Sequence, residues 1–319
     1  MILSPEVLTL FILNGIFAFF AIIAFFYSVK IFLYWDANST CQVQYNLEKQ
    51  SFLSATIIKY IFVIKVPLFL FFIFTLDKIS ALLTGAMCAA GVANATDYGT
   101  YLIVLKILNL YLFAYWLVLH NEDMKHEEQP YTRVKFGIFM VAFFLLITEL
   151  VLEGVMFNAI DIQKVVDCCG AIYSSASSSY ISTLFRIQTP VLLTLFYANF
   201  LLIVLSYFLK KRYIFALSNA TFIIISLIAL ISFFGTYIYE LPTHHCPFCF
   251  LQKEYYFVGY FIYVFLFIGT FYGLIVGFLR TSKDEISKNY KISLLFNFLY
   301  VILLSSYPIL FYIKNGVWL

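Results

Sequence analysis

The chain has 319 residues, of which 63% are hydrophobic, 21% are aromatic and only 12% are charged. A single water-soluble core of this length cannot enclose so much apolar surface, so the composition excludes a soluble globular protein and indicates a protein that crosses a membrane several times. The net charge of +3 is small for this length and gives no reason to expect a nucleic-acid partner.

Apolar runs recur along the whole chain. A membrane-spanning helix needs about 20 predominantly apolar residues, and eight runs approach or exceed this length. We therefore predict an all-α fold, a polytopic integral membrane helical bundle with about eight transmembrane helices. The expected spans are residues 7–29, 57–76, 99–119, 134–155, 187–209, 213–238, 255–279 and 292–313.

Basic residues lie mainly on one side of these spans. Thirteen of the 20 Lys and Arg residues flank or follow the odd-numbered spans, five lie on the opposite side and two lie inside spans. Because basic residues are enriched in cytoplasmic loops, the first set marks the expected cytoplasmic face. We thus expect a multi-pass protein of the bacterial inner (cytoplasmic) membrane with both termini outside. Residues 1–6 contain no Lys or Arg, and no clear cleavage site follows, so we expect an uncleaved first helix.

Charged residues also fall inside the predicted spans, among them Lys65, Lys106, Glu149 and Glu153. An ionised side chain in hydrocarbon is costly unless it is paired or hydrated. Glu149 and Glu153 are one helical turn apart on one face. We expect them to pair with Lys65 or Lys106 as a structural lock, while a proton path and a metal route are the alternatives.

The cysteines are concentrated on the predicted outer side. Only Cys41 lies on the expected cytoplasmic face. Because an oxidising compartment supports disulfides, this skew predicts thiol chemistry at the outer face. Structural disulfides that tie the loops together are the alternative. The five cysteines in or beside the outer loops are Cys88, Cys168, Cys169, Cys246 and Cys249.

The most informative motif is Cys-Pro-Phe-Cys at residues 246–249, between the sixth and seventh spans. Two thiols at this spacing can close a disulfide, and we expect the pair at the start of a helix, where the helix dipole favours the thiolate. The motif therefore predicts a reversible redox pair. His244 and His245 precede it, and two imidazoles with two thiolates could instead hold zinc or copper. A purely structural pair is the third possibility.

Residues 246–253, Cys-Pro-Phe-Cys-Phe-Leu-Gln-Lys, resemble the Cys-X-X-Cys segment of DsbB, the quinone-linked thiol oxidase, in which a basic residue follows a few positions on. Lys253 takes that basic place. The order of elements is more similar to the vitamin K epoxide reductase relatives of DsbB, whose first outer loop carries cysteines and a serine. The residues that match the family's Cys, Ser, Tyr, Leu-Phe-Gly-Ile-Pro run are Cys169, Ser175, Tyr180, Leu184, Phe185, Ile187 and Pro190.

The resemblance covers roughly residues 134–280. It implies an N-terminal three-helix membrane region at 1–133, a four-helix core like that of DsbB and vitamin K epoxide reductase at 134–280, and a C-terminal helix at 281–319. The loop departs from the family in its adjacent Cys168-Cys169, because a vicinal disulfide is strained, and in Arg186 where glycine is usual. Cys88 could supply the missing partner from another loop; otherwise the shuttle role is lost.

The activity that the resemblance implies is that of a quinone-dependent membrane thiol–disulfide oxidoreductase. Electrons would pass from an extracytoplasmic thioredoxin-like thiol protein to a cysteine of the 158–186 loop, then to the Cys-X-X-Cys pair and on to a quinone. Cys246 would exchange with the loop and Cys249 would face the quinone. Lys253 would polarise a quinone oxygen, and Ser175 would cover the pocket.

Two hypotheses of other classes stand beside this one. In the first, the protein handles copper or another metal and passes it to an extracytoplasmic enzyme. In the second, it is a structural subunit of a membrane complex. The metal ligands of the first hypothesis are His244, His245, Cys246 and Cys249, aided by Cys88.

Overall fold

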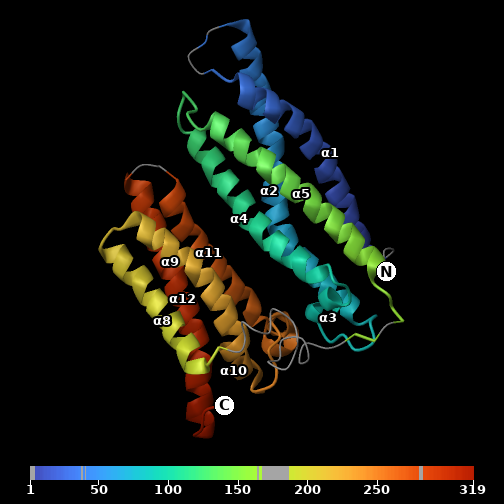
Figure 1. Ribbon diagram of the computed structural model, residues 1–319, viewed down its shortest axis with the longest axis vertical. Coiled ribbons are helices and arrows are strands. Elements are labelled where there is room, and N and C mark those ends of the chain that lie inside the picture. The colour runs from blue at the N-terminus through green and yellow to red at the C-terminus, as the bar shows by residue number, and fades with distance from the viewer. Residues whose placement is uncertain (1–3, 37–38, 40, 164, 167–186, 280–282) are drawn as a thin grey trace. The chain divides into compact units, whose positions relative to one another are not determined.

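The computed structural model describes the chain except for residues 1–3, 37–38, 40, 164, 167–186 and 280–282, which are drawn in grey (Figure 1). The described residues contain no strand, and eight of their helical segments are long and apolar enough to cross a membrane. The predicted all-α, multi-pass helical bundle is therefore confirmed. The eight segments are α1 (Pro5–Tyr34), α2 (Gln42–Ser80), α4 (Gly99–Asp123), α5 (Thr132–Ala159), α8 (Thr189–Phe208), the run α9–η1–α10 (Arg212–Tyr239), α11 (Val258–Phe278) and α12 (Lys283–Asn315).

Some helices continue beyond the apolar run that predicted them. Apolar residues led us to expect a span at 57–76, whereas α2 has 39 residues and begins at Gln42. At 1.5 Å per residue this helix is about 58 Å long, about twice the thickness of the hydrocarbon core of a bilayer. Hydropathy marks only the part of a helix that lies in lipid, so it misses polar turns outside the membrane.

The chain folds into two compact units, which we describe separately. They divide the chain differently from the three regions expected from the sequence. α5, which was expected to open the Cys-X-X-Cys core, packs against α1 and α4, and α12, which was expected to follow that core, packs against α11 inside it. Unit 1 comprises Met1–Thr84 and Val92–Val166, and unit 2 comprises Gly85–Gly91 and Asp167–Leu319.

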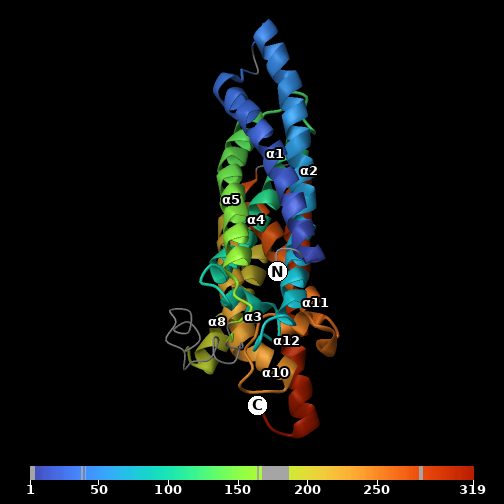
Figure 2. The same ribbon diagram turned by 90° about the vertical axis from the view of Figure 1, so that its right-hand side faces the viewer.

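Unit 1 has an aromatic core between its four long helices, α1, α2, α4 and α5, which run alongside one another in Figure 2. Phe62 of α2 stacks on Phe113 of α4 with ring centroids 4.2 Å apart, and it meets Trp116 edge-on at 5.4 Å. Such pairs add about 0.5–1.5 kcal/mol each beyond the burial of their area. Large apolar side chains such as Phe26 and Phe144 point outward instead, as a lipid environment permits.

Unit 2 is held by close helix contacts and by hydrogen bonds between them. Gly269 and Gly273 of α11 face Asn297 of α12 and Asn219 of α9, and a Cβ at either glycine would overlap the facing side chain. Asn297 Nδ2 donates to Asn219 Oδ1 at 2.8 Å, and Ser293 Oγ donates to the same oxygen at 3.3 Å. Small residues and interhelical polar contacts are the usual means of helix association in lipid, where hydrophobic burial no longer favours contact.

The sixth span changes its winding near its C-terminal end. α9 (Arg212–Ala229) is followed by a π-helical turn, η1 (Leu230–Phe234), and then by α10 (Gly235–Tyr239). Glu240 ends α10 in the left-handed conformation, with φ of 53°. π-helical turns are rare overall, and those that occur are frequently found at functional sites. Only the five residues of α10 separate this turn from the loop that carries the Cys-Pro-Phe-Cys motif.

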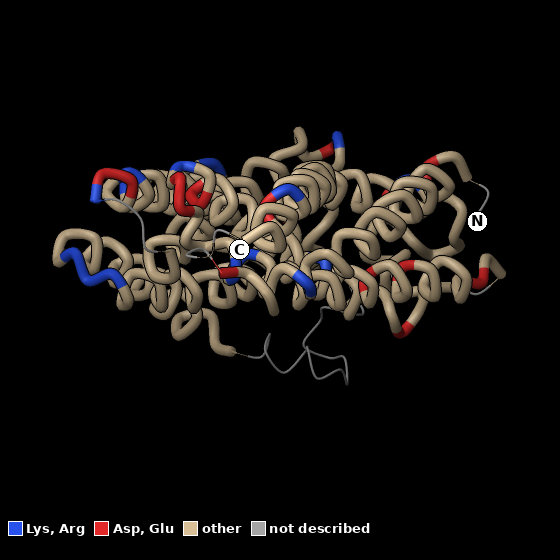
Figure 3. Tube along the Cα trace, turned by 90° about the horizontal axis from the view of Figure 1, so that it is seen from above, with Lys and Arg blue, Asp and Glu red and all other residues tan. Residues whose placement is uncertain are grey.

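Charged residues are sparse along the helices, and long uncharged stretches of chain separate short charged segments (Figure 3). In unit 1 the C-terminal end of α4 and the N-terminal end of α5 carry several of these charges, among them Lys125, Arg133 and Lys135. By the positive-inside rule this end is predicted to face the cytoplasm.

Candidate functional site

The Cys-Pro-Phe-Cys motif lies in the loop between α10 and α11. Cys249 opens a short 3-10 helix, Cys249–Leu251, and α11 begins only at Val258. We expected the pair at the start of a helix, and the helix that begins at Cys249 is only this three-residue 3-10 helix. Tyr256 and Phe257 both have positive φ values, 53° and 56°, which interrupt helical winding immediately before α11. An argument from the dipole of a long helix does not apply to these thiols.

Two tyrosine hydroxyls from the flanking helices hold the backbone of this loop. Tyr239 Oη donates to Cys246 O at 2.6 Å and accepts a hydrogen bond from Phe250 N at 3.1 Å. Tyr263 Oη of α11 donates to Pro247 O at 2.5 Å. The ring of Phe250 stacks on that of Tyr239 at 5.9 Å. Hydrogen bonds thus hold the backbone of the loop at Cys246 and Pro247 within the motif and at Phe250 directly after it.

Cys88 lies beside the motif although 158 residues separate it from Cys246. Its sulfur is 3.4 Å from the Cys246 sulfur, and the three sulfurs of Cys88, Cys246 and Cys249 lie within 4.8 Å of one another. All three side chains are buried. The 3.4 Å distance exceeds the length of a disulfide bond, about 2.05 Å, so the first two sulfurs are in direct non-bonded contact. Cys88 was considered above as the partner that the 158–186 loop lacks. The structure places it against the Cys-X-X-Cys pair.

The short segment around Cys88 is shaped by two glycines. Gly85 has a φ of +92°, a conformation that L side chains rarely adopt. At Gly91 a Cβ would lie 2.8 Å from the Cβ of Ala86, so the turn that holds Cys88 needs glycine there. Gln252 Nε2 donates to Met87 O at 3.3 Å and so ties this segment to the Cys-X-X-Cys loop.

A backbone donor contacts the central sulfur of the cluster. Phe248 N donates to Cys246 Sγ at 3.3 Å. A hydrogen bond to sulfur favours its ionised form. Cys246 is also the cysteine that lies next to both potential partners, because Cys88 touches it from one segment and Cys249 follows it in the motif.

The two histidines are not part of the cluster of sulfurs. His245 Nδ1 donates to Ile231 O in the π-helical turn at 3.0 Å, since a carbonyl oxygen can only accept. The His244 ring meets Tyr239 edge-on at 4.3 Å, and its enclosed Nε2 has no hydrogen-bond partner among the described residues. Burial lowers the pKa of the His244 imidazole, which is therefore neutral at pH 7. The group of potential metal ligands that comes together is three thiols and not the expected two thiols and two imidazoles.

Other residues expected at the site are exposed or lie outside the described part. Lys253 is exposed in the short 3-10 helix Lys253–Tyr255. Burial raises the pKa of the neighbouring Tyr255 hydroxyl, and the nearby Cys249 adds to this effect. Cys168, Cys169 and Ser175 lie outside the described residues, so their exchange with the pair and their cover of the pocket stay predictions.

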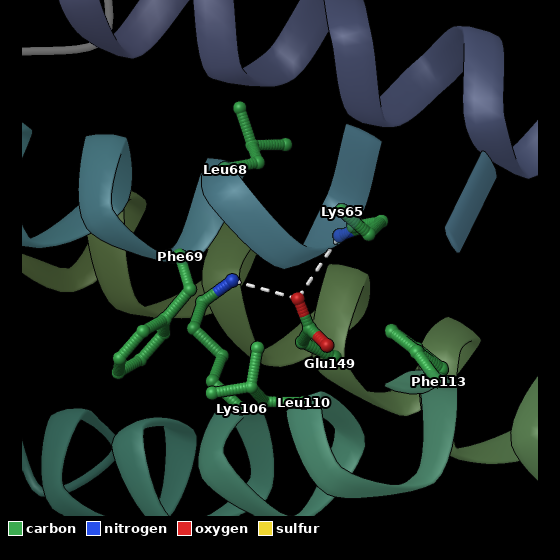
Figure 4. A pocket seen from close by; sticks show the side chains of 7 residues that line it. All are labelled: Lys65, Leu68, Phe69, Lys106, Leu110, Phe113 and Glu149. Carbon is green, nitrogen blue, oxygen red and sulfur yellow. Dashed lines mark hydrogen bonds and ion pairs between the residues drawn. The ribbon is translucent and has the colours of Figure 1, made fainter. Parts of the chain in front are cut away.

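A second polar cluster is buried in the middle of unit 1, and Figure 4 shows part of it. Lys65 and Lys106 lie 3.0 and 2.7 Å from Glu149 Oε1, and Lys106 lies 2.7 Å from Glu153 Oε2. All four side chains are 7% exposed or less. The predicted pairing of the two carboxylates with the two lysines is therefore confirmed.

Two asparagines complete this network. Asn14 accepts from Lys65 Nζ at 2.9 Å and donates to Glu153 Oε1 at 2.8 Å. Asn109 Nδ2 donates to Glu149 Oε2 at 2.6 Å. The charged residues of the spans did not point to these asparagines. A polar amide inside an otherwise apolar span is the sequence signal that could have identified them. The adjoining cavity, about 10 Å³, has room for about one water molecule.

No match to this chain is found among protein-family models, curated proteins or solved structures.

Proposed function

We propose that the protein is a membrane thiol–disulfide oxidoreductase that couples the Cys246–Cys249 pair to a membrane quinone. The observation that carries this proposal is the 3.4 Å separation between the sulfurs of Cys88 and Cys246. Thiol–disulfide exchange requires direct attack of one sulfur on another. A buried contact between a remote cysteine and a Cys-X-X-Cys pair is the arrangement that such exchange needs.

The exchange step involves only the three cysteines, and its bonds and electrons balance among them. When Cys246 and Cys249 form a disulfide, the Cys88 thiolate attacks Cys246 Sγ. A Cys88–Cys246 bond forms, the Cys246–Cys249 bond breaks, and its electron pair leaves on Cys249 Sγ. The hydrogen bond from Phe248 N holds the Cys246 sulfur, the atom under attack, in place, and Tyr239 and Tyr263 hold the backbone of the loop.

Electrons enter and leave the cluster by two-electron steps. An extracytoplasmic thioredoxin-like dithiol gives up two electrons and two protons as it forms its disulfide. A quinone takes up two electrons and two protons, becomes the quinol, and restores the Cys246–Cys249 disulfide. Because Cys88 is fully buried, we assign it as an inner relay, with Cys168 or Cys169 as the cysteine that meets the partner protein.

The surroundings of the pair suit an apolar oxidant. The rings of Tyr239, Phe250 and Tyr263 pack beside the motif, and the hydroxyl of Tyr255 stays protonated near Cys249. Lys253 lies four residues beyond Cys249. In this proposal it is the basic group that polarises a quinone oxygen.

Copper handling is the second candidate, and a specific observation favours it. Three buried sulfurs within 4.8 Å could bind one ion, and soft thiolates select Cu(I). Structural zinc almost always has four ligands, so three sulfurs fit copper better. In this alternative the thiols stay reduced and bind the metal instead of exchanging electrons.

Trapping of the mixed disulfide separates the two candidates. In the Cys249→Ser variant, Cys88 and Cys246 should accumulate as one disulfide in native membranes, and peptide mapping under non-reducing conditions would detect it. Cys41→Ser is the matched control, since Cys41 is exposed on the other predicted face. Thiols that stay reduced in membranes with oxidised quinone, together with stoichiometric Cu(I) binding by the purified protein, would contradict the oxidoreductase proposal.

A further inference from the structure

Unit 1 contains a second, larger cavity at the end that is predicted to face the cytoplasm. It has a volume of about 260 Å³ and is lined by side chains of α2, by the C-terminal end of α4, by Gln129 in the turn before α5 and by Lys135 in the first turn of α5. A single water needs only about one probe sphere of about 10–15 Å³. The cavity is therefore large enough for a polyatomic ligand.

The lining of this cavity is basic. It includes Lys59, His120 and Lys135, and it contains no Asp or Glu. Lys135 is buried, and its Nζ lies 2.5 Å from Asp123 Oδ2, so its charge is balanced. Lys59 is exposed and has no carboxylate partner among the described residues. The positive charge of Lys59 thus remains for a ligand in the cavity to balance.

His120 supports the same conclusion from a buried position. Its side chain is only 6% exposed, and its ring stacks on Trp116 with centroids 5.1 Å apart. Its Nδ1 is enclosed and has no hydrogen-bond partner among the described residues. A buried polar atom without a partner is costly, and a ligand is one way in which such an atom is satisfied.

The rim of the cavity is apolar on one side. Phe52 and Tyr60 line it and are 65% and 64% exposed. The predicted apolar run of α2 begins at residue 57, so this rim lies where the helix passes from lipid to the aqueous phase. A basic, half-apolar pocket at this depth matches the level of phospholipid headgroups, which anionic lipids approach with a phosphate.

We propose that this cavity binds a phosphate group, with Lys59 as its counter-ion and with His120 as a further contact. The phosphate belongs to the headgroup of an anionic phospholipid or to free inorganic phosphate. Both share the chemistry of a charge-assisted hydrogen bond from an ammonium group. The site is independent of the cysteine cluster, because all of its residues belong to unit 1.

The test uses the full-length protein and two probes. Native mass spectrometry would measure the binding of phosphatidylglycerol against phosphatidylcholine, and thermal unfolding in detergent would be followed with and without inorganic phosphate. Lys59→Gln should weaken phosphatidylglycerol binding about tenfold, the effect of one charge-assisted hydrogen bond. Lys49→Gln is the matched control, because Lys49 is an exposed lysine of the same helix that does not line the cavity.

His120→Phe is the second variant, since it keeps a ring that can stack on Trp116 and removes the polar nitrogens. It should unfold at the wild-type temperature or higher without ligand, and it should lose affinity as Lys59→Gln does. A preference for phosphatidylglycerol without a shift from inorganic phosphate identifies the lipid headgroup, and a shift with inorganic phosphate alone identifies the free anion. Wild-type affinity for both probes in either variant, or an equal loss in Lys49→Gln, would overturn the proposal.

Discussion

The two units bring polar groups together in opposite ways. In unit 1 two lysines and two glutamates meet at 2.7–3.0 Å, so each buried charge faces an opposite one. In unit 2 three groups of the same kind, the thiols of Cys88, Cys246 and Cys249, meet in a buried place. Opposite charges in a closed cluster compensate for each other's burial, and loss of one of them leaves an uncompensated charge in the apolar interior.

Three thiols cannot stabilise a fold in that manner. If all three were ionised, they would repel one another in a medium of low dielectric constant. They can gain by forming a covalent sulfur–sulfur bond or by binding a soft cation. We therefore propose a structural role for the ion network and a chemical role for the thiols.

Replacement of Cys88 by Ser should have the largest effect on activity. Without the inner relay, dithiol-dependent quinone reduction should fall to the background rate, while the thermal unfolding temperature changes little because Ser and Cys are similar in size. Quinone absorbance with a dithiol donor measures the rate. Cys41→Ser should keep wild-type turnover, and an active Cys88→Ser protein would show that the contact between Cys88 and Cys246 has no role in exchange.

Glu149→Gln should have the largest effect on stability. The variant removes a carboxylate that pairs with both Lys65 and Lys106, and it leaves buried charge without compensation. Loss of one partner of a buried pair costs about 3–5 kcal/mol. Denaturant unfolding in detergent would measure this loss. Glu153→Gln removes one of the three ion pairs and is the milder comparison. Slower turnover at unchanged stability would instead favour the proton path.

Tyr239→Phe should have an intermediate effect that reaches both properties. The change removes the hydrogen bonds to Cys246 O and Phe250 N. Each buried group left without a partner costs about 1–3 kcal/mol. Disulfide exchange should slow because the backbone of the loop is no longer held in position. Tyr263→Phe removes one hydrogen bond to the same loop and should show a smaller change in both measurements. Equal stability of Tyr239→Phe and wild type would show that the hydroxyl does not hold the loop.

Asn297→Ala should have the smallest effect. The side chain donates to Asn219 Oδ1 between α12 and α9. Interhelical hydrogen bonds in membrane proteins contribute about 0.6 kcal/mol on average. Unfolding measurements should therefore show a slight loss, and activity should be unchanged. A loss as large as that of Glu149→Gln would mean that unit 2 also depends on a buried polar lock.

Much of the candidate chemistry could be predicted because its signals are local. Glu149 and Glu153 are one turn apart, and charges within apolar spans need partners, so their pairing with Lys65 and Lys106 followed. The short length of the helix that begins at Cys249, and the start of α11 only at Val258, did not follow. The left-handed Tyr256 and Phe257 that delay α11 have no signature in hydropathy, since neither is glycine or asparagine.

The sequence by itself determined the medium and the building blocks: the apolar runs require lipid around eight helices, because only a helix satisfies its own backbone hydrogen bonds there. The tertiary structure alone decided which helices are neighbours, and so placed α5 in unit 1 and α12 in unit 2. It also placed Cys88 against Cys246 across 158 residues. Such contacts depend on how helix faces and loops fit together in space, which the periodicity of a single segment does not encode.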